Sequence, residues 1–361
     1  MPSRRTGGVL VTGGAGFIGS ALSRLAAPSA ARWVALDSLN RRIHETPGRP
    51  PALDPAAELV VGDIVDERAW DEVLDDWHPD TVVHLAAETD TGLSLTSPTR
   101  FTRTNVDGTA QLLEALDRHD ARPRRIVVAS SRAVYGEGTW TDRRTGAAGP
   151  RPQRSRQQLQ QGQWDFPDAS PVVTRAGVTR EHPTNVYGVT KLAQEGLLSS
   201  WCGAYDVALT ILRLQNVYGP GQSLINPYTG ILALFVRQSA AGIPIGVYED
   251  GQMLRDFVHI DDVARAFATV VGDGYTEPGV RTLDIGTGRP ATVLEMASAL
   301  AASFGAPSPV ITGEFREGDI RHAWCTVDEA SEHLGWRARV DWEDGLRDYA
   351  DWYRKRQEQA S

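Results

Sequence analysis

The sequence has little cysteine and no long run of apolar residues. Its two cysteines, Cys202 and Cys325, stand far apart among 361 residues and match neither a metal-binding spacing nor a disulfide framework. No apolar stretch approaches the ~20 residues that a membrane-spanning helix needs, and no apolar signal segment precedes the first expected strand. We therefore expect no metal site, no membrane association and a reduced, cytoplasmic location.

The sequence also has fewer basic than acidic residues. The 37 Lys and Arg residues are outnumbered by 46 Asp and Glu residues, so the formal net charge is −9. An acidic chain is repelled by the phosphates of nucleic acid and by anionic lipid surfaces, so neither is an expected partner. With 41% hydrophobic residues, the composition suits one large or two coupled globular domains.

A glycine-rich turn is the most informative feature that the sequence does contain. Gly13, Gly14, Gly16 and Gly19 lie between an apolar run and a segment with helical apolar spacing, as in dinucleotide-binding turns. Such glycines permit a tight turn and let a helix N-terminus approach a pyrophosphate. Asp37 ends the next apolar run, where a carboxylate binds the ribose 2′-hydroxyl and repels a 2′-phosphate. The pattern predicts NAD as the cofactor, in preference to NADP.

Strand-like and helical patterns alternate through the first half of the chain. Apolar runs cover residues 8–12, 32–37, 58–62, 81–85, 125–130 and 207–213, and helical patterns include residues 67–76, 104–118 and 186–201. This alternation predicts an α/β fold with a Rossmann doubly wound parallel sheet. We expect a dinucleotide-binding domain over residues 1–220 and a smaller, partly interwoven substrate domain over residues 221–361, where the alternation loosens.

Residues 139–183 interrupt this alternation. The segment is rich in Arg, Gln, Pro and Gly and poor in apolar residues. A structureless segment of this length is unusual inside a compact domain. Two interpretations stay open: a tolerated surface insertion, or a lid or subunit contact.

Tyr187 and Lys191 lie four residues apart on an expected helix and so share one face. The ordinary pKa of tyrosine is about 10, but a nearby ammonium and a cationic nicotinamide would lower it. The phenolate could then take a proton from a sugar or alcohol hydroxyl. Ser130 and Ser131 end a strand at the edge of the sheet where ligands bind, and a hydroxyl there could assist. The competing interpretation is that these are ordinary surface and turn residues.

Together, these motifs resemble the extended short-chain dehydrogenase/reductase family, specifically its nucleotide-sugar epimerases and dehydratases. The resemblance extends from Val9 to about Trp352. Its motifs are the glycine-rich turn, His84-Leu85-Ala86-Ala87, Asn105-Val106-Asp107-Gly108-Thr109, Ser131, Tyr187-x-x-x-Lys191, the stretch 212–221 and the stretch 255–262.

The resemblance implies a catalytic triad of Ser131, Tyr187 and Lys191, with NAD as cofactor and a nucleotide-diphosphate sugar as substrate. The implied cofactor contacts are Gly13, Gly16, Phe17, Ile18, Gly19, Asp37, Asp63, Ile64, Leu85, Ala86, Ala87, Asn105, Tyr187 and Lys191. The implied substrate contacts are Glu88, Thr89, Ser131, Arg132, Asn216, Arg255 and Arg316, the last two on the diphosphate. It also implies a homodimer through the helices 104–118 and 187–201, with an apolar surface from Leu112, Leu113, Leu116, Leu192, Leu197 and Leu198.

Within this family, the 4,6-dehydratases place Asp-Glu directly after the triad Ser/Thr, whereas this chain has Arg132 and Ala133. Epimerisation at C4 needs no additional acid and base, so it fits better. The stretches 87–92 and 222–231 resemble the dTDP-L-rhamnose 4-epimerase branch, although the Cys-x-x-Cys pair common in that branch is absent from the insertion. A 4-ketoreductase and a 4-epimerase of UDP-glucuronate or UDP-glucose stay open as alternatives. A dinucleotide-sensing regulator is disfavoured, because Tyr187 and Lys191 are both present.

Overall fold

The computed structural model describes residues 6–44, 48–224, 230–275 and 278–360. Two expectations touch positions outside these ranges: the absence of a signal segment at the start of the chain, and residues 225–229 of the stretch 222–231. Within the described residues, no helix is both long and apolar enough to cross a membrane.

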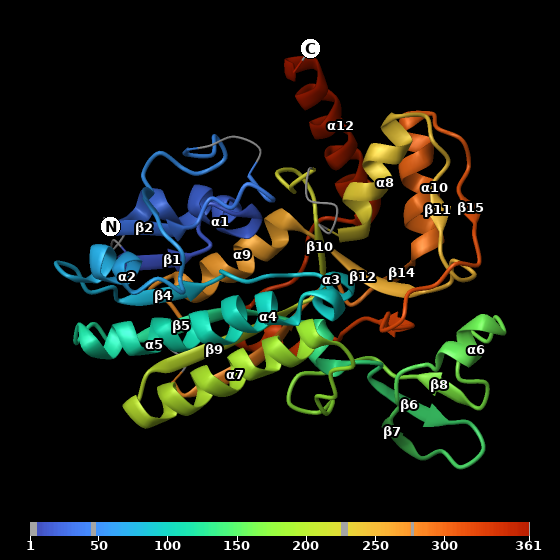
Figure 1. The fold of residues 1–361 in the computed structure, drawn as a ribbon, viewed down its shortest axis with the longest axis horizontal. Helices are drawn as coiled ribbons and strands as arrows, with labels where there is room; N and C mark the ends of the chain where they lie inside the picture. Colours follow the sequence, from blue (N-terminus) through green and yellow to red (C-terminus); the bar gives the residue numbers. More distant parts are fainter. Residues whose placement is uncertain (1–5, 45–47, 225–229, 276–277, 361) are drawn as a thin grey trace.

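A parallel sheet of seven strands forms the centre of the fold (Figure 1). Its order is β13-β9-β5-β4-β1-β2-β3, and each neighbouring pair is parallel. The strands are β1 (Thr6–Thr12), β2 (Ala30–Asp37), β3 (Glu58–Val61), β4 (Thr81–His84), β5 (Arg125–Ser131), β9 (Ala208–Leu214) and β13 (Val280–Ile285). Order and direction confirm the predicted α/β Rossmann class.

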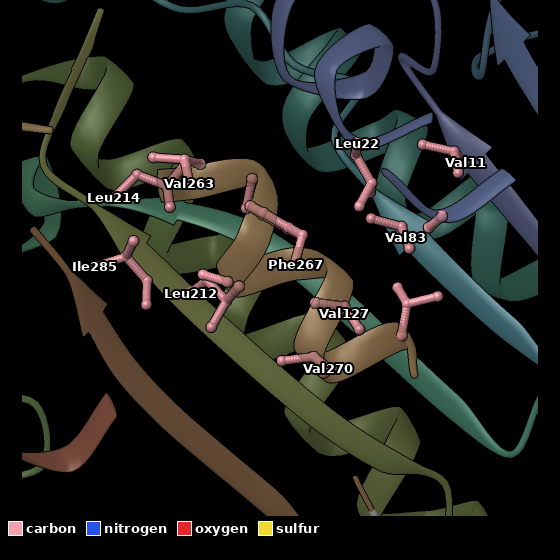
Figure 2. Close-up of a cluster of buried hydrophobic side chains, with 14 of the residues drawn as sticks. Val11, Leu22, Val83, Val127, Leu212, Leu214, Val263, Phe267, Val270 and Ile285 are labelled. Carbon is pink, nitrogen blue, oxygen red and sulfur yellow. The ribbon is translucent and has the colours of Figure 1, made fainter. Parts of the chain in front are cut away.

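Helices cover both faces of this sheet (Figure 1). One face carries α1 (Phe17–Ala26), α9 (Ile260–Val271) and α11 (Asp328–Leu334), and the other carries α2 (Glu67–Leu74), α5 (Gly108–Arg118) and α7 (Val186–Tyr205). Figure 2 shows the first of the two cores, where Phe267 of α9 lies among aliphatic side chains of the strands. Because both faces are covered, the buried parts of the central strands are continuously apolar, as at Val9, Leu10 and Val11 of β1, which are fully buried.

The chain beyond residue 220 builds a second region and also returns to the sheet. Its elements are α8 (Gly230–Ala240), β11 (Gly246–Val247), β12 (Leu254–His259), β14 (Pro290–Thr292), α10 (Val293–Phe304), β15 (Val310–Ile311), β16 (His322–Ala323) and α12 (Trp342–Ala360), with β10 (Asn216–Tyr218) beside β12. Phe235, Met296 and Tyr349 anchor its core. Since α9 covers one face of the parallel sheet and β13 forms one edge, the two regions share secondary structure.

The insertion 139–183 is folded rather than structureless. It contains a small antiparallel sheet of β7 (Ala148–Pro150), β6 (Thr139–Asp142) and β8 (Ala169–Pro171), together with α6 (Arg156–Gln160). Trp140 of β6 is 1% exposed and packs edge-on against the ring of Phe166. A single buried aromatic anchor of this kind leaves little periodic signal in the sequence.

The expected dimer surface is largely wrong in its residues. Leu112, Leu116 and Leu198 are 0% exposed and Leu113 is 7% exposed, because all four face the sheet of their own chain. They belong to the core formed by α2, α5 and α7. Of the six predicted leucines, only Leu192 and Leu197 are partly exposed.

Candidate functional site

The predicted site residues converge at the carboxyl edge of the parallel sheet. The turn after β1, the segment after β4, the end of β5 and the first turn of α7 all lie there. Connecting these strands to helices on opposite faces opens a crevice at this edge. The elements therefore bring together residues that are more than 170 positions apart in the chain.

The glycine-rich turn has the backbone geometry of a dinucleotide cradle. Gly13 has φ +64° and donates its N–H to the Leu36 carbonyl at 2.8 Å. A Cβ on Gly13 would lie 2.8 Å from the backbone nitrogen of Ala86, and one on Gly19 would lie 2.5 Å from the Gly14 carbonyl oxygen. Helix α1 begins after Gly16 without a side-chain cap, so the N–H groups of its first turn can receive an anion. This geometry fits a bound pyrophosphate.

Asp37 is held at the end of β2, beside the turn. The residue is 7% exposed. Its carboxylate accepts from the N–H of Ala15 at 3.0 Å and from the N–H of Leu39 at 2.9 Å. His44 Nε2 lies 3.4 Å from Asp37 Oδ1. These contacts fix a carboxylate where the resemblance implies the adenosine ribose.

Replacing Asp37 with Ala should reduce the preference for NAD over NADP by roughly 10-fold or more, since one hydrogen bond to a charged group is lost together with the repulsion of a 2′-phosphate. The measurement is the dissociation constants of NAD and NADP, together with mass spectrometry of the co-purified cofactor. Asp37→Asn is the control, because it keeps an acceptor for Ala15 while removing the charge. Mainly NADP in the unmodified protein would contradict the assignment.

A hollow of about 560 Å³ lies next to the turn after β3. It is lined by Asp63, Val65, Glu88, Ser97, Thr99, Arg100, Arg103 and Thr104. Glu88 faces it as half of a bidentate pair with Arg100, both oxygens being 2.6 Å from a guanidinium nitrogen. Asp63 is exposed at its edge, whereas the Ile64 side chain is 4% exposed and packs into the core.

Asn105 joins three parts of the site. It lies in a π-helical turn, Thr102–Asp107, between α4 (Pro98–Phe101) and α5. Its amide accepts from the Glu88 N–H at 2.8 Å and donates to the Glu88 carbonyl at 3.0 Å and to Thr190 Oγ1 at 2.9 Å. Asn105 is 0% exposed. Its side chain thus fixes the segment after β4 against α7.

Lys191 is buried and held from two sides. Its Nζ donates to the Ala129 carbonyl at 2.9 Å and to Gln194 Oε1 at 2.8 Å. Gln194 Nε2 lies 3.0 Å from His84 Nε2, so the network continues to β4. Burial lowers the pKa of Lys191 to about 7 and that of His84 to about 3. Gln194 was not predicted, although it lies on the same face of α7 three residues after Lys191.

Ser131 and Tyr187 form the predicted pair. Ser131 Oγ accepts from the Ala133 N–H at 3.1 Å, and the Ser131 side chain lies close enough to Tyr187 to affect its pKa. The Tyr187 ring packs edge-on against Phe101 with centroids 6.3 Å apart. Burial raises the pKa of Tyr187, while Ser131 and the charge of Arg132 lower it. The expected lowering of this pKa by the Lys191 ammonium and a cationic nicotinamide stays a prediction.

The three predicted arginines, Arg132, Arg255 and Arg316, differ in how many of their guanidinium N–H groups already donate hydrogen bonds within the protein. Arg132 Nε donates to Asn216 Oδ1 at 2.8 Å, but its buried NH1 finds no partner among the described residues. Burial lowers the pKa of Arg132 to about 9. Arg255, in contrast, donates to the carbonyls of Leu254 at 2.8 Å, Arg321 at 3.0 Å and Ile320 at 2.5 Å. Arg316 is exposed, with its guanidinium over the Tyr248 ring at 5.3 Å.

The remaining predicted residues at this edge of the sheet are more exposed to solvent. Phe17, Ile18, Leu85, Ala86 and Ala87 are partly buried, and Thr89 is exposed.

The sequence reasoning missed Asp90, which lies at the same edge. Asp90 has φ +117° and is the N-cap of α3 (Thr91–Thr96), accepting from the Leu93 N–H at 2.5 Å. Burial raises its pKa, and its charge in turn raises the pKa of Tyr187. The only sequence signal was an acidic residue directly after the stretch 86–89.

Comparisons with known proteins agree with this geometry. The chain matches the model of the NAD-dependent epimerase/dehydratase family over residues 9–157 and 166–286. It is 48% identical to a dTDP-L-rhamnose 4-epimerase of Burkholderia thailandensis over 345 residues, which is 95% of this chain and 94% of that protein.

Solved structures show the same fold. The structure of a UDP-glucose 4-epimerase from Thermotoga maritima, with UDP-glucose, is 27% identical, has a TM-score of 0.79 and is matched over 97% of this chain and 99% of that chain. The structure of MoeE5 with UDP-glucuronic acid and NAD is 31% identical, with a TM-score of 0.76 over 97% and 99% of the two chains. The predicted resemblance and the predicted cofactor are confirmed at this level: the chain belongs to the NAD-dependent epimerase/dehydratase family.

Proposed function

We propose that the protein is an NAD-dependent nucleotide-sugar 4-epimerase that inverts C4 of a dTDP-deoxyhexose. The observation that carries this is that Ser131 lies near Tyr187 and is followed by Arg132 and Ala133, where a dehydratase would need a neighbouring acid and base. The 48% identity to a protein named dTDP-L-rhamnose 4-epimerase supports the choice of sugar and nucleotide.

The cradle at Gly13, the N-terminus of α1 and the Asp37 carboxylate fit NAD, so these groups hold its pyrophosphate and adenosine ribose. Lys191 holds the second ribose, with its position set by Ala129 and Gln194. When bound, NAD supplies the acceptor and then the donor of the C4 hydride.

Tyr187 takes the proton of the C4 hydroxyl and later returns it. Its raised pKa makes the phenolate costly, so nearby positive charge is needed for it to act as a base. Arg132 supplies such charge, and its NH1, which has no partner among the described residues, can donate to a substrate oxygen. Ser131 lies near Tyr187 and orients the reacting hydroxyl. No additional acid or base is required, because the C–H bond broken at C4 is remade at the same carbon.

The nucleotide stays fixed while the sugar presents its second face. We assign the diphosphate to Arg316, whose exposed guanidinium is free of ion pairs among the described residues. Arg255 supports this residue indirectly, because its hydrogen bonds hold the backbone of Ile320 and Arg321 in the same segment.

Two features of organisation are part of this proposal. Residues 1–220 form the NAD-binding domain, and residues 221–361 form the nucleotide-sugar domain that shares α9 and β13 with the sheet. The protein is a homodimer through α5 and α7, whose outer face carries the 53% exposed Val189. Light scattering that gives the 39.3 kDa mass of one chain at every concentration would contradict the dimer.

The test is incubation of the purified protein with dTDP-L-rhamnose, without added cofactor, followed by NMR. We expect interconversion with the C4 epimer at a ratio near unity, no net change in reduced-nicotinamide absorbance, and retention of the C4 hydrogen in heavy water. UDP-glucose and UDP-glucuronate are the comparison substrates. Strict dependence on added NADH or NADPH would replace the proposal with a ketoreductase. A stable 4-keto-6-deoxy product from dTDP-glucose would indicate a dehydratase.

A further inference from the structure

The insertion 139–183 is tied to the nucleotide-sugar domain by buried charges. Arg154 is 3% exposed and donates to both oxygens of Glu249, at 2.8 and 2.9 Å. Arg321, 1% exposed, binds the same carboxylate at 3.0 Å and also pairs with Asp165 of the insertion. In Figure 1, β6, β7, β8 and α6 form a green lobe below β14. Removing one partner from such a buried network is costly, so the lobe has a defined position.

The same part of the insertion contacts three successive residues of the segment 316–321. Arg156 Nε lies 3.2 Å from Glu317 Oε1, and Arg154 NH2 donates to the Asp319 carbonyl at 3.0 Å. Between them, in the orientation that satisfies its amide, Gln153 accepts from the Gly318 N–H at 2.6 Å. Together these contacts fix the outer side of the segment.

Two further side chains hold the inner side of this segment. Glu137 Oε2 accepts from the Arg321 N–H at 2.9 Å, and Arg255 binds the carbonyls of Ile320 and Arg321. Each residue from 317 to 321 is therefore contacted by the insertion, Glu137 or Arg255.

The segment lies beside α3, the short helix that begins after Asp90. A Cβ on Gly318 would lie 3.8 Å from Leu95 Cδ1 of that helix. The charge of Arg316 also lowers the pKa of Asp90, and the charge of Asp319 raises it. The segment therefore borders the edge of the candidate site that holds Asp90.

We propose that the insertion is a clamp for the segment 316–321, with Arg154 as its positioning residue, and that the clamp sets Arg316 to bind the diphosphate of the nucleotide. This rests on the proposed function for the identity of the ligand. The insertion is then neither a tolerated surface loop nor a lid. Its contribution is to remove the conformational freedom that the segment would otherwise lose on binding.

Arg154→Met tests the clamp, with Arg143→Met as the matched control. Arg143 lies in the same insertion, but its side chain is exposed and donates to Ser170 at 3.0 Å, away from the segment. The readouts are dTDP and UDP binding by calorimetry, NAD content, and KM and kcat. For Arg154→Met we expect KM and the nucleoside diphosphate Kd to rise about 10-fold or more, with kcat changed by less than about 3-fold, as for loss of binding common to ground and transition states. NAD content should be unchanged, and Arg143→Met should match the unmodified protein.

A lowered melting temperature with unchanged Kd and KM would overturn the clamp and leave a purely structural insertion. If Arg154→Met yields no folded protein, Gln153→Ala decides, because it removes the Gly318 contact without disturbing a buried charge: weaker dTDP binding supports the clamp, and equal binding overturns it. An unmodified protein that binds neither dTDP nor UDP would instead overturn the proposed function. The two failures are therefore distinguishable.

Discussion

Tyr187→Phe should lower turnover at least ~100-fold, the contribution typical of a positioned general base, while the NAD content stays the same. The substitution removes only the hydroxyl, and the ring keeps its edge-on packing against Phe101. The NAD contacts that we propose for Gly13, Asp37 and Lys191 do not involve that hydroxyl. The measurement is kcat with the nucleotide sugar by NMR, alongside mass spectrometry of the bound cofactor.

Ser131→Ala is the companion variant for this prediction. Ser131 assists through one hydrogen bond, so its loss should reduce kcat less than the loss of the Tyr187 hydroxyl. Activity retained by Tyr187→Phe would mean that another group takes the proton. Equal losses in the two variants would mean that Ser131 does more than orient the hydroxyl.

Gly13→Ala should weaken NAD binding at least ~100-fold, on the scale that a displacement of about 1 Å at a binding site can cause. The new Cβ would lie 2.8 Å from the backbone nitrogen and 2.9 Å from the Cα of Ala86, and backbone cannot rotate away as a side chain can. The φ of +64° adds about 1–2 kcal/mol of strain for any residue with a Cβ. NAD titration and thermal unfolding measure the two effects separately.

Gly242→Ala is the control that separates the effect of backbone strain from the effect of displacing the neighbouring backbone. Gly242 has φ +68°, close to that of Gly13, but a Cβ there would meet nothing within 4 Å. It should therefore lose only the about 1–2 kcal/mol of stability that comes from strain, and no NAD affinity. If Gly13→Ala bound NAD as tightly as Gly242→Ala does, the turn after β1 would not be the cofactor cradle.

The parallel sheet could be predicted because its strands are signalled locally. The expected run 125–130 corresponds to β5 (Arg125–Ser131), and 32–37 corresponds to β2 (Ala30–Asp37). Strands buried on both faces need continuous apolar runs, and these are visible in any short window. The edge strand β13 (Val280–Ile285) was missed, because Arg281, Thr282 and Asp284 interrupt its apolar residues. An edge strand leaves one side open to polar groups.

The direction of helix faces was harder to predict. Leu112 and Leu198 mark apolar faces in the sequence, but only the tertiary structure shows that these faces pack on the chain's own sheet. A helical period identifies an apolar side without identifying what covers it.

The sequence by itself determined the chemistry that depends on close spacing. The glycine turn ending at Gly19, the pair Tyr187 and Lys191, and the absence of an acid–base pair after Ser131 can each be read within a few residues. Such motifs are local because they are built on one turn or one helix face.

Only the tertiary structure decided which charges act on that chemistry. It brought the charges of Arg132 and Asp90 close enough to affect the pKa of Tyr187, in opposite directions. It also joined Arg154 of the insertion to Glu249 and to the Asp319 carbonyl. Burial and electrostatic interaction depend on distance in space, which no pattern of neighbouring residues records.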